Sequence, residues 1–199
     1  MVLQKKLRGS DSDAMSKAKG TVMMGVVKAI QDHRERALPL VPQNLHHYFD
    51  TRIVLAAWYP LEDYLTLLRL VIKLVPNAPA DFYEQVGRDS AREQMTGIYS
   101  RLRSDKSHKA TLTLLGSMYD SGEMKVVERA PGRSVLEWVG FAIPCKELCK
   151  TFTGYTAERM TLQGAENVKV HHSRCRADGA DVCRWDLSWK SRSKSETPA

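Results

Sequence analysis

The sequence has no long uninterrupted apolar run. A membrane-spanning helix needs roughly 18 apolar residues, and the longest apolar segment, residues 61–75, contains both acidic and basic side chains. Residues 1–20 carry positive charge, but no apolar run follows them as a secretory signal would require. We therefore expect a protein that is not exported, has no membrane span and resides in the cytoplasm.

Common catalytic signatures are also missing. The sequence contains no HExxH, no GxSxG, no phosphate-cradling glycine loop and no GxGxxG. His46 and His47, followed by Asp50, lie next to proline-rich residues, where adjacent histidines are typical of an exposed loop. No candidate nucleophile has a recognisable base, so the sequence predicts a protein that is not an enzyme.

A nucleic-acid footprint is lacking as well, although the formal net charge is +7. The basic residues are scattered, and part of the excess lies near the two ends, in residues 4–8 and 190–195. No helix-turn-helix or RNA-binding motif accompanies them. Nucleic acid is therefore not an expected partner.

What is present is the composition of a globular domain, with 43% apolar and 27% charged residues in a chain of 199. We expect disordered tails at residues 1–17 and 191–199. Residues 18–190 then form one domain, with a helical N-terminal part at 18–79 and a core part at 80–190. No internal repeat or domain linker interrupts it.

Hydrophobic periodicity, prolines and glycines predict the order of elements. We expect helices over residues 20–36, 61–74, 81–103, 108–119 and 144–164, and strands over 123–130, 134–140, 167–175 and 182–190. A block of helices followed by strand, strand, helix, strand, strand predicts an α+β fold with an antiparallel sheet.

The chain has four cysteines, Cys145, Cys149, Cys175 and Cys183. Disulfides are rare in a reducing compartment, and thiols in two close pairs are more typical of metal ligands. The alternative is that they are buried free cysteines acting as small apolar groups, which suits Cys145 best.

Strand alternation places two of the candidate donors. Successive side chains of a strand point to opposite faces, so Cys183 shares a face with Trp185, and His172 shares one with Val170. His172, and not His171, is therefore expected to point inward beside Cys183. Cys175 lies where the first of these strands enters the loop.

A helix supplies the third thiol. Cys145 and Cys149 fall on one face of the helix over 144–164. With Cys149, the set of three thiolates and the His172 imidazole suits tetrahedral zinc, and four protein ligands make the site structural. An all-cysteine site with Cys145 in place of His172 is the competing arrangement.

This pattern resembles the zinc site of the 4-vinyl-reductase-type ligand-binding domain found in phenol- and xylene-responsive activators. The resemblance extends over about residues 80–190, includes the closing GADVCRW at 179–185, and selects Cys149 over Cys145. His172 stands where a carboxylate is usual. The domain is similar in fold to TRAPP subunits and haem-type nitric oxide sensors. The N-terminal half resembles an uncharacterised myxobacterial family.

The resemblance implies an apolar cavity for a small aromatic or hydrophobic ligand, and a homodimer. The sequence offers nine aromatic or methionine side chains for that cavity, which alternatively only fill the core: Phe82, Tyr83, Tyr99, Met118, Tyr119, Trp138, Phe141, Phe152 and Tyr155. No Tyr-x-Ser-x-Arg motif for haem propionates occurs.

We therefore expect a zinc-stabilised module that binds a small hydrophobic ligand and signals through a partner protein or its dimer surface. One alternative is a TRAPP-like scaffold with a packed core. Another is an accessory enzyme of tetrapyrrole or aromatic metabolism.

Overall fold

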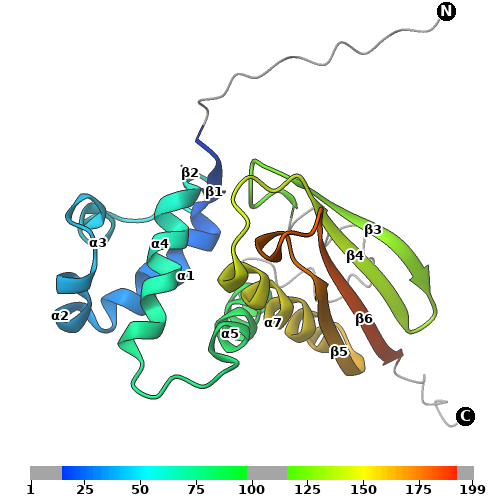
Figure 1. The fold of residues 1–199 in the computed structure, drawn as a ribbon. Helices are drawn as coiled ribbons and strands as arrows, with labels where there is room; N and C mark the ends of the chain where they lie inside the picture. The colour runs from blue at the N-terminus through cyan, green and yellow to red at the C-terminus, as the bar shows by residue number, and fades with distance from the viewer. Residues whose placement is uncertain (1–14, 98–115, 192–199) are drawn as a thin grey trace, which may run out of the picture.

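The computed structural model describes residues 15–97 and 116–191 as a layered α+β fold. Figure 1 shows the N-terminal helices on one side, the sheet on the other, and α5 and α7 between them. The predicted α+β class is confirmed. No helix within the described residues is both long and apolar enough to cross a membrane.

The N-terminal part consists of short helices and a small two-stranded sheet. Its elements are β1 (Lys17–Lys19), α1 (Gly20–Gln31), α2 (Arg34–Ala37), η1 (Leu38–Leu40), η2 (Gln43–Leu45), α3 (His47–Asp50), β2 (Trp58–Pro60), α4 (Leu61–Val71) and η3 (Ile72–Leu74). The helix predicted over 20–36 is two helices, because the backbone of His33 leaves the helical region. The expected N-terminal tail ended at Lys17, which begins β1 and pairs with Pro60.

The C-terminal part is a helix pair against a four-stranded antiparallel sheet. Its elements are α5 (Phe82–Thr96), β3 (Glu123–Ala130), β4 (Arg133–Val139), α7 (Lys146–Leu162), β5 (Ala165–Arg174), η5 (Arg176–Asp178) and β6 (Cys183–Ser191). The strand order is β3-β4-β6-β5, so the last strand lies inside the sheet. The end of the helix predicted over 81–103 and most of the one over 108–119 lie outside the described residues.

The hairpin between β3 and β4 turns on a proline–glycine pair. Ala130 is opposite Arg133, so Pro131 and Gly132 are the two central turn residues. Gly132 has φ of 71°, the left-handed conformation that glycine adopts most readily. Trp189 N–H of β6 donates to the Gly132 carbonyl at 2.9 Å, which fixes the turn to the sheet.

One face of the sheet is buried under α7. Trp185 on β6 has no exposed surface, and its ring lies 4.6 Å from that of Phe152 between centroids. The indole N–H donates to the Thr153 hydroxyl at 3.0 Å, as a buried tryptophan requires. These contacts hold α7 at a fixed position over β5 and β6.

The opposite side of α7 meets α5 with the two backbones in contact. A Cβ atom on Gly87 would lie 1.9 Å from the Thr151 carbonyl oxygen, and one on Gly154 would lie 1.8 Å from the Glu84 carbonyl oxygen. Only hydrogen fits at these two positions, so glycine is what allows the helices to approach so closely.

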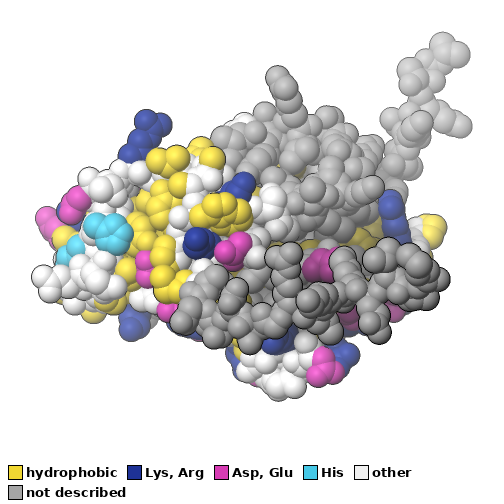
Figure 2. Space-filling model, turned by 90° about the horizontal axis from the view of Figure 1, so that it is seen from above, with side chains coloured by type: hydrophobic (Ala, Val, Ile, Leu, Met, Phe, Trp, Pro, Cys, Tyr) yellow, Lys and Arg dark blue, Asp and Glu magenta, His cyan; other side chains and the backbone are white. Residues whose placement is uncertain are grey.

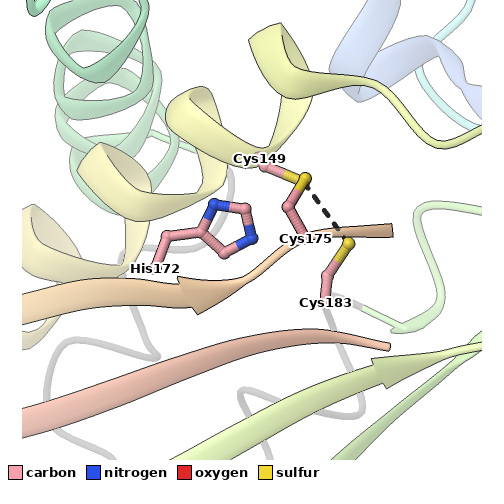
Figure 3. Close-up of side chains that lie close together, drawn as sticks. All are labelled: Cys149, His172, Cys175 and Cys183. Atoms are coloured by element: carbon pink, nitrogen blue, oxygen red, sulfur yellow. Dashed lines mark hydrogen bonds between the residues drawn. The ribbon is translucent and has the colours of Figure 1, made fainter. Parts of the chain in front are cut away.

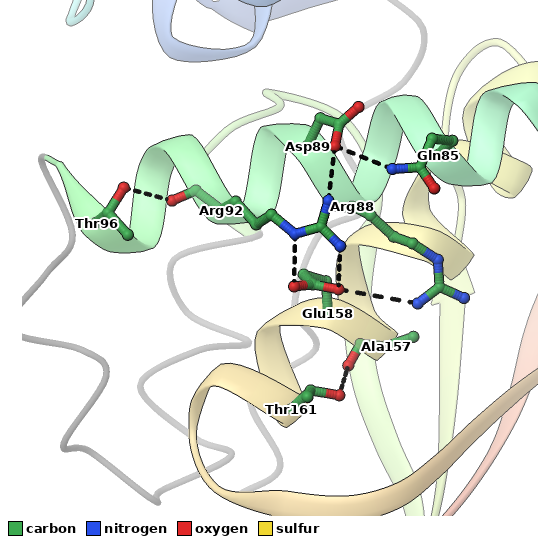
Figure 4. A network of polar contacts seen from close by, with 8 residues as sticks. All are labelled: Gln85, Arg88, Asp89, Arg92, Thr96, Ala157, Glu158 and Thr161. Atoms are coloured by element: carbon green, nitrogen blue, oxygen red, sulfur yellow. Dashed lines mark hydrogen bonds and ion pairs between the residues drawn. The ribbon is translucent and has the colours of Figure 1, made fainter.

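A carboxylate at the same helix pair joins the two helices electrostatically (Figure 4). The Arg92 guanidinium of α5 contacts both oxygens of Glu158 on α7, at 2.8 and 3.1 Å, and Arg88 lies 4.0 Å from the same carboxylate. Arg92 also donates to Asp89 at 2.9 Å. The α5–α7 pair is therefore joined through backbone contact and a bidentate ion pair.

Candidate functional site

Four potential metal ligands meet at the mouth of the β5–β6 hairpin. Cys149 comes from α7, His172 from β5, Cys175 from the residue between β5 and η5, and Cys183 from the start of β6 (Figure 3). Their donor atoms all lie within 4.8 Å of one another. The structure thus brings together the four predicted donors, while their binding of an ion stays a prediction.

The three thiols of the cluster differ in their pKa values. The Cys149 thiol donates to Cys183 Sγ at 3.6 Å, and the Arg176 N–H also points to that sulfur at 3.4 Å. The hydrogen bond from Cys149 lowers the pKa of Cys183 and raises that of Cys149, because it favours the thiolate of the acceptor. Burial raises the pKa of Cys175.

The imidazole is held in a fixed orientation. The His172 ring stacks on Trp185, with centroids 4.7 Å apart and planes 17° from parallel. Its Nε2 atom is buried, and its interaction with Cys183 adds to that of Cys149 in lowering the pKa of the Cys183 thiol. A buried imidazole beside a thiol of lowered pKa is a suitable metal donor.

Cys145 lies outside this cluster. Its thiol donates to Glu147 at 2.9 Å and lies 3.5 Å from a nitrogen of Arg69 on α4. Burial raises the pKa of Cys145, so it is a protonated thiol at the junction of α4 and α7. The arrangement is not the all-cysteine alternative, in which Cys145 replaces His172.

A cavity of about 220 Å³ lies between α1 and α4 on one side and α5 and α7 on the other, with β3 and β4 contributing. Its described lining is mostly apolar and aromatic: Thr21, Val22, Met24, Gly25, Val26, Ala29, Tyr64, Val71, Val86, Asp89, Ser90, Glu93, Gln94, Met118, Tyr119, Met124, Trp138, Leu148, Thr151, Phe152 and Tyr155.

Five of the nine predicted pocket residues belong to this lining: Met118, Tyr119, Trp138, Phe152 and Tyr155. Three do not. Phe141 packs behind Trp138, with centroids 4.1 Å apart, and Phe82 packs edge-on against Tyr83 at 5.4 Å. Tyr99 lies outside the described residues.

Sequence reasoning missed the α1 wall of the cavity, because the family resemblance covered only residues 80–190. The available signal was the spacing of Thr21 and Gly25, which puts a hydroxyl and an unfilled position one helical turn apart on one face.

Most polar groups in the lining are already paired. Tyr155 donates to Gln94 Oε1 at 3.0 Å, and Tyr119 is hydrogen-bonded to Tyr64. The Thr21 hydroxyl oxygen has no hydrogen-bond partner among the described residues, but it is buried with almost no accessible surface of its own. A ligand would therefore meet a wall that is mostly apolar and aromatic.

The fold is that of H-NOX domains. No protein-family model matches the sequence, and no curated protein matches it. Comparison with solved structures instead gives several H-NOX domains with TM-scores of 0.55 to 0.61 at 12–13% identity. Such low identity shows a shared fold and nothing finer.

Two neighbours illustrate the match. An H-NOX protein from S. oneidensis in the Fe(II) ligation state has a TM-score of 0.60 at 13% identity, over 90% of this chain and 100% of that one. An oxygen-binding H-NOX domain related to soluble guanylate cyclases, in its oxygen complex, has a TM-score of 0.59 at 12% identity, over 91% and 100%.

These neighbours correct two predictions. The identification as a 4-vinyl-reductase-type domain is wrong, because the structural matches described are H-NOX domains. Three cysteines around a hairpin mouth closed by a helix are a local arrangement, and here they occur in a chain whose overall fold is that of H-NOX domains. The prediction of zinc as the cofactor is also wrong, since the neighbours' names give Fe(II) and heme.

The described lining does not fit haem. Haem iron is held by histidine, cysteine, tyrosinate or a methionine–histidine pair, and neither histidine nor cysteine is among the described lining residues. Burial raises the pKa of Tyr64 and Tyr119, which disfavours tyrosinate. No described lysine or arginine faces the cavity to pair with the haem carboxylates, and 220 Å³ is below the roughly 300–1,000 Å³ of typical cofactor sites.

Proposed function

We propose that this chain is a non-enzymatic sensor domain that binds a small hydrophobic molecule in the cavity between α1 and α5. The cavity carries the proposal: at about 220 Å³ it exceeds the roughly 150 Å³ in which an apolar engineered cavity binds benzene. Its apolar and aromatic lining favours a ligand of one substituted ring.

The structural comparison supports the same class of function by analogy of fold. One neighbour is an oxygen-binding H-NOX domain, so this fold binds a small molecule in at least one other protein. The chemistry differs here, because the described lining suits an apolar organic molecule rather than haem.

The test is ligand binding by the full chain. We expect propylbenzene to raise the melting temperature, since a ligand at 100 times its dissociation constant stabilises by about 2.7 kcal/mol. Gly25→Leu is the matched control, because it projects a side chain into the cavity from α1 and should abolish the shift. No shift with the unmodified chain contradicts the proposal.

The TRAPP-like scaffold alternative predicts a fully packed core, and a cavity of this size argues against it.

We also propose that the domain passes its signal to a second copy of the chain or to a partner protein. Leu40, Val54 and Trp58 are large exposed hydrophobic residues of the N-terminal part, and Figure 2 shows hydrophobic side chains gathered over that part. Sedimentation velocity should show a dimer. A monomer at all concentrations would contradict the dimer, and the signal would then pass to a separate partner protein.

We also propose that the hairpin cluster holds one thiophilic metal ion. Three sulfurs and one imidazole nitrogen within 4.8 Å support this, because thiolate-rich sets select soft metals. Elemental analysis of the purified chain identifies the element. Less than about 0.1 ion per chain after metal-supplemented expression would contradict it.

A further inference from the structure

The cavity reaches the surface along α5. Asp89 and Glu93 belong to its lining, and their side chains are 62% and 51% exposed. The aromatic part of the lining is buried instead, since Trp138, Phe152 and Tyr155 are at most 6% exposed. The mouth of the cavity therefore lies on the side where α5 faces α1.

The two helices that border this mouth are held to each other weakly. In the part of the chain that the structure describes, α1 packs on α4 and α5 packs on α7, whereas α1 and α5 approach each other closely at few points. The Lys28 ammonium lies 3.9 Å from the Glu93 carboxylate, and both side chains are more than half exposed, so this ion pair contributes little to stability. The Gln94 amide nitrogen lies 3.5 Å from the Thr21 carbonyl oxygen, which is longer than the usual hydrogen bond.

Small residues face each other at the mouth. A Cβ atom on Gly25 would lie 3.8 Å from the Ser90 hydroxyl oxygen and would have no other neighbour within 4 Å outside its own helix. Both residues are partly exposed and both line the cavity. Glycine inside a helix costs about 1 kcal/mol relative to alanine, and serine is also a poorer helix former. These two residues leave a gap between α1 and α5 that larger side chains would close.

The other sides of the cavity are packed more tightly. At the α5–α7 contact, Gly87 and Gly154 bring the two helix backbones together. On the sheet side, the Phe152 ring lies 5.9 Å from that of Trp138 and 4.6 Å from that of Trp185. Local opening occurs most readily where the fewest buried contacts are lost. The helices α1 and α5 should therefore separate before any other wall of the cavity.

We infer that the ligand enters and leaves the cavity between α1 and α5, and that Gly25 and Ser90 set the width of this opening. The inference rests on the proposed function, since it requires that the cavity hold a ligand. Lys28 is not part of the lining, so its ion pair with Glu93 slows passage through the opening without adding to the affinity. Gly25 and Ser90 thus determine how fast a ligand exchanges, whereas the buried aromatic residues determine how tightly it binds.

The first test closes the opening in the full chain with the double variant Gly25→Cys and Ser90→Cys. The 3.8 Å between the Gly25 Cβ position and the Ser90 hydroxyl oxygen places the two new thiols within reach of a disulfide. After treatment with oxidised glutathione, we expect association and dissociation of propylbenzene to slow by at least about 10-fold, the equivalent of about 1.4 kcal/mol in the barrier.

Stopped-flow tryptophan fluorescence measures both rates, because Trp138 lines the cavity. Reduction of the same double variant should restore the rates, so the comparison removes any effect of the two substitutions themselves. The unmodified chain treated with the same reagent is the control for the four native cysteines.

The second test weakens the opening without adding a cysteine. Lys28→Glu places two carboxylates across the mouth, and we expect both rates to rise by about 2–5-fold. The dissociation constant should stay nearly unchanged, because the free and the bound protein open through the same contact. Lys73→Glu on η3 is the matched control, since it changes the net charge equally at an exposed residue outside the lining, and it should leave both rates unchanged.

The outcomes separate the two proposals. If propylbenzene does not bind the unmodified chain, the proposed function fails and the inference fails with it. If it binds, but the oxidised double variant exchanges it as fast as the reduced one, the inference fails and the function stands. Failure of the two cysteines to form a disulfide would also overturn the inference, because positions 25 and 90 would then not face each other. Equal rates in Lys28→Glu and Lys73→Glu would count against an ion pair across the opening.

Discussion

His172 and Cys183 show how far single residues can be placed from sequence. Alternation along β5 and β6 predicted that both point inward, and the structure places both beneath α7 (Figure 3). A period of two is a property of the strand itself, so it needs no knowledge of distant partners. Phe141 was misplaced because its position behind Trp138 depends on packing between segments far apart in the chain.

The cysteines provide the first prediction. If the cluster holds the proposed ion, Cys183→Ser should release it and lower the melting temperature, because metal binding in such sites is coupled to folding. Cys145→Ser is the matched control, since its thiol bonds to Glu147 and not to the cluster. Elemental analysis and thermal melts measure both, and equal metal content in the two variants would contradict the assignment.

At the scale of elements, α7 is buried on two faces, whereas helical spacing had indicated only the face that carries the cysteines. Cys149 and Phe152 pack toward the sheet, as helical spacing indicated, while Gly154 and Tyr155 face α5. Sequence periodicity favours a single apolar stripe, so a helix buried on both sides gives a weak pattern. The contact of Gly154 with Glu84 could not be predicted from the sequence, because the residues next to each of them in the chain do not specify it.

Replacing glycine by alanine should have opposite effects on stability at the α5–α7 contact and at the open position on α1. Gly154→Ala should lower the free energy of unfolding by about 1–3 kcal/mol or more, because the new methyl group meets the Glu84 backbone. Gly25→Ala should raise it by up to about 1 kcal/mol, since alanine favours the helix and the position is open.

Urea denaturation measures both glycine variants. A tolerated Gly154→Ala would show that α5 and α7 can separate without cost. A destabilised Gly25→Ala would show that the α1 wall is closely packed and the cavity smaller than described.

At the scale of the whole molecule, the order of elements predicted the α+β class and an antiparallel sheet, but not the spatial order of the strands. Because β6 lies between β4 and β5, Trp138 pairs with Cys183. These two strands are separated in sequence by α7, and local sequence patterns do not specify that they pair. The cavity likewise needs Thr21 and Tyr155 together. Such contacts between distant parts of the chain are what single-sequence reasoning lacks, and the family was misidentified for the same reason.

The buried tyrosines predict instability at alkaline pH. Burial raises the pKa of Tyr48, Tyr64 and Tyr119 well above the usual value of about 10. Their contribution to stability is therefore fully present below about pH 10 and is lost as the pH rises from there toward the folded-state pKa, because only the unfolded chain ionises.

Thermal melts between about pH 8 and pH 11 measure this loss. Tyr48→Phe should reduce the alkaline slope, because it removes one of these groups, while also losing the 2.6 Å hydrogen bond to Asp63. A melting temperature that stays constant through this range would contradict the burial of the tyrosines.

The cavity beneath α1 has a consequence for how long the chain lasts. A bound ligand would stabilise the folded state by mass action, so a chain without ligand would open more often and meet proteases more often. Turnover should then depend on how much of the ligand is present. The amount of this protein would itself report the supply of the compound, before any signal passes to another molecule.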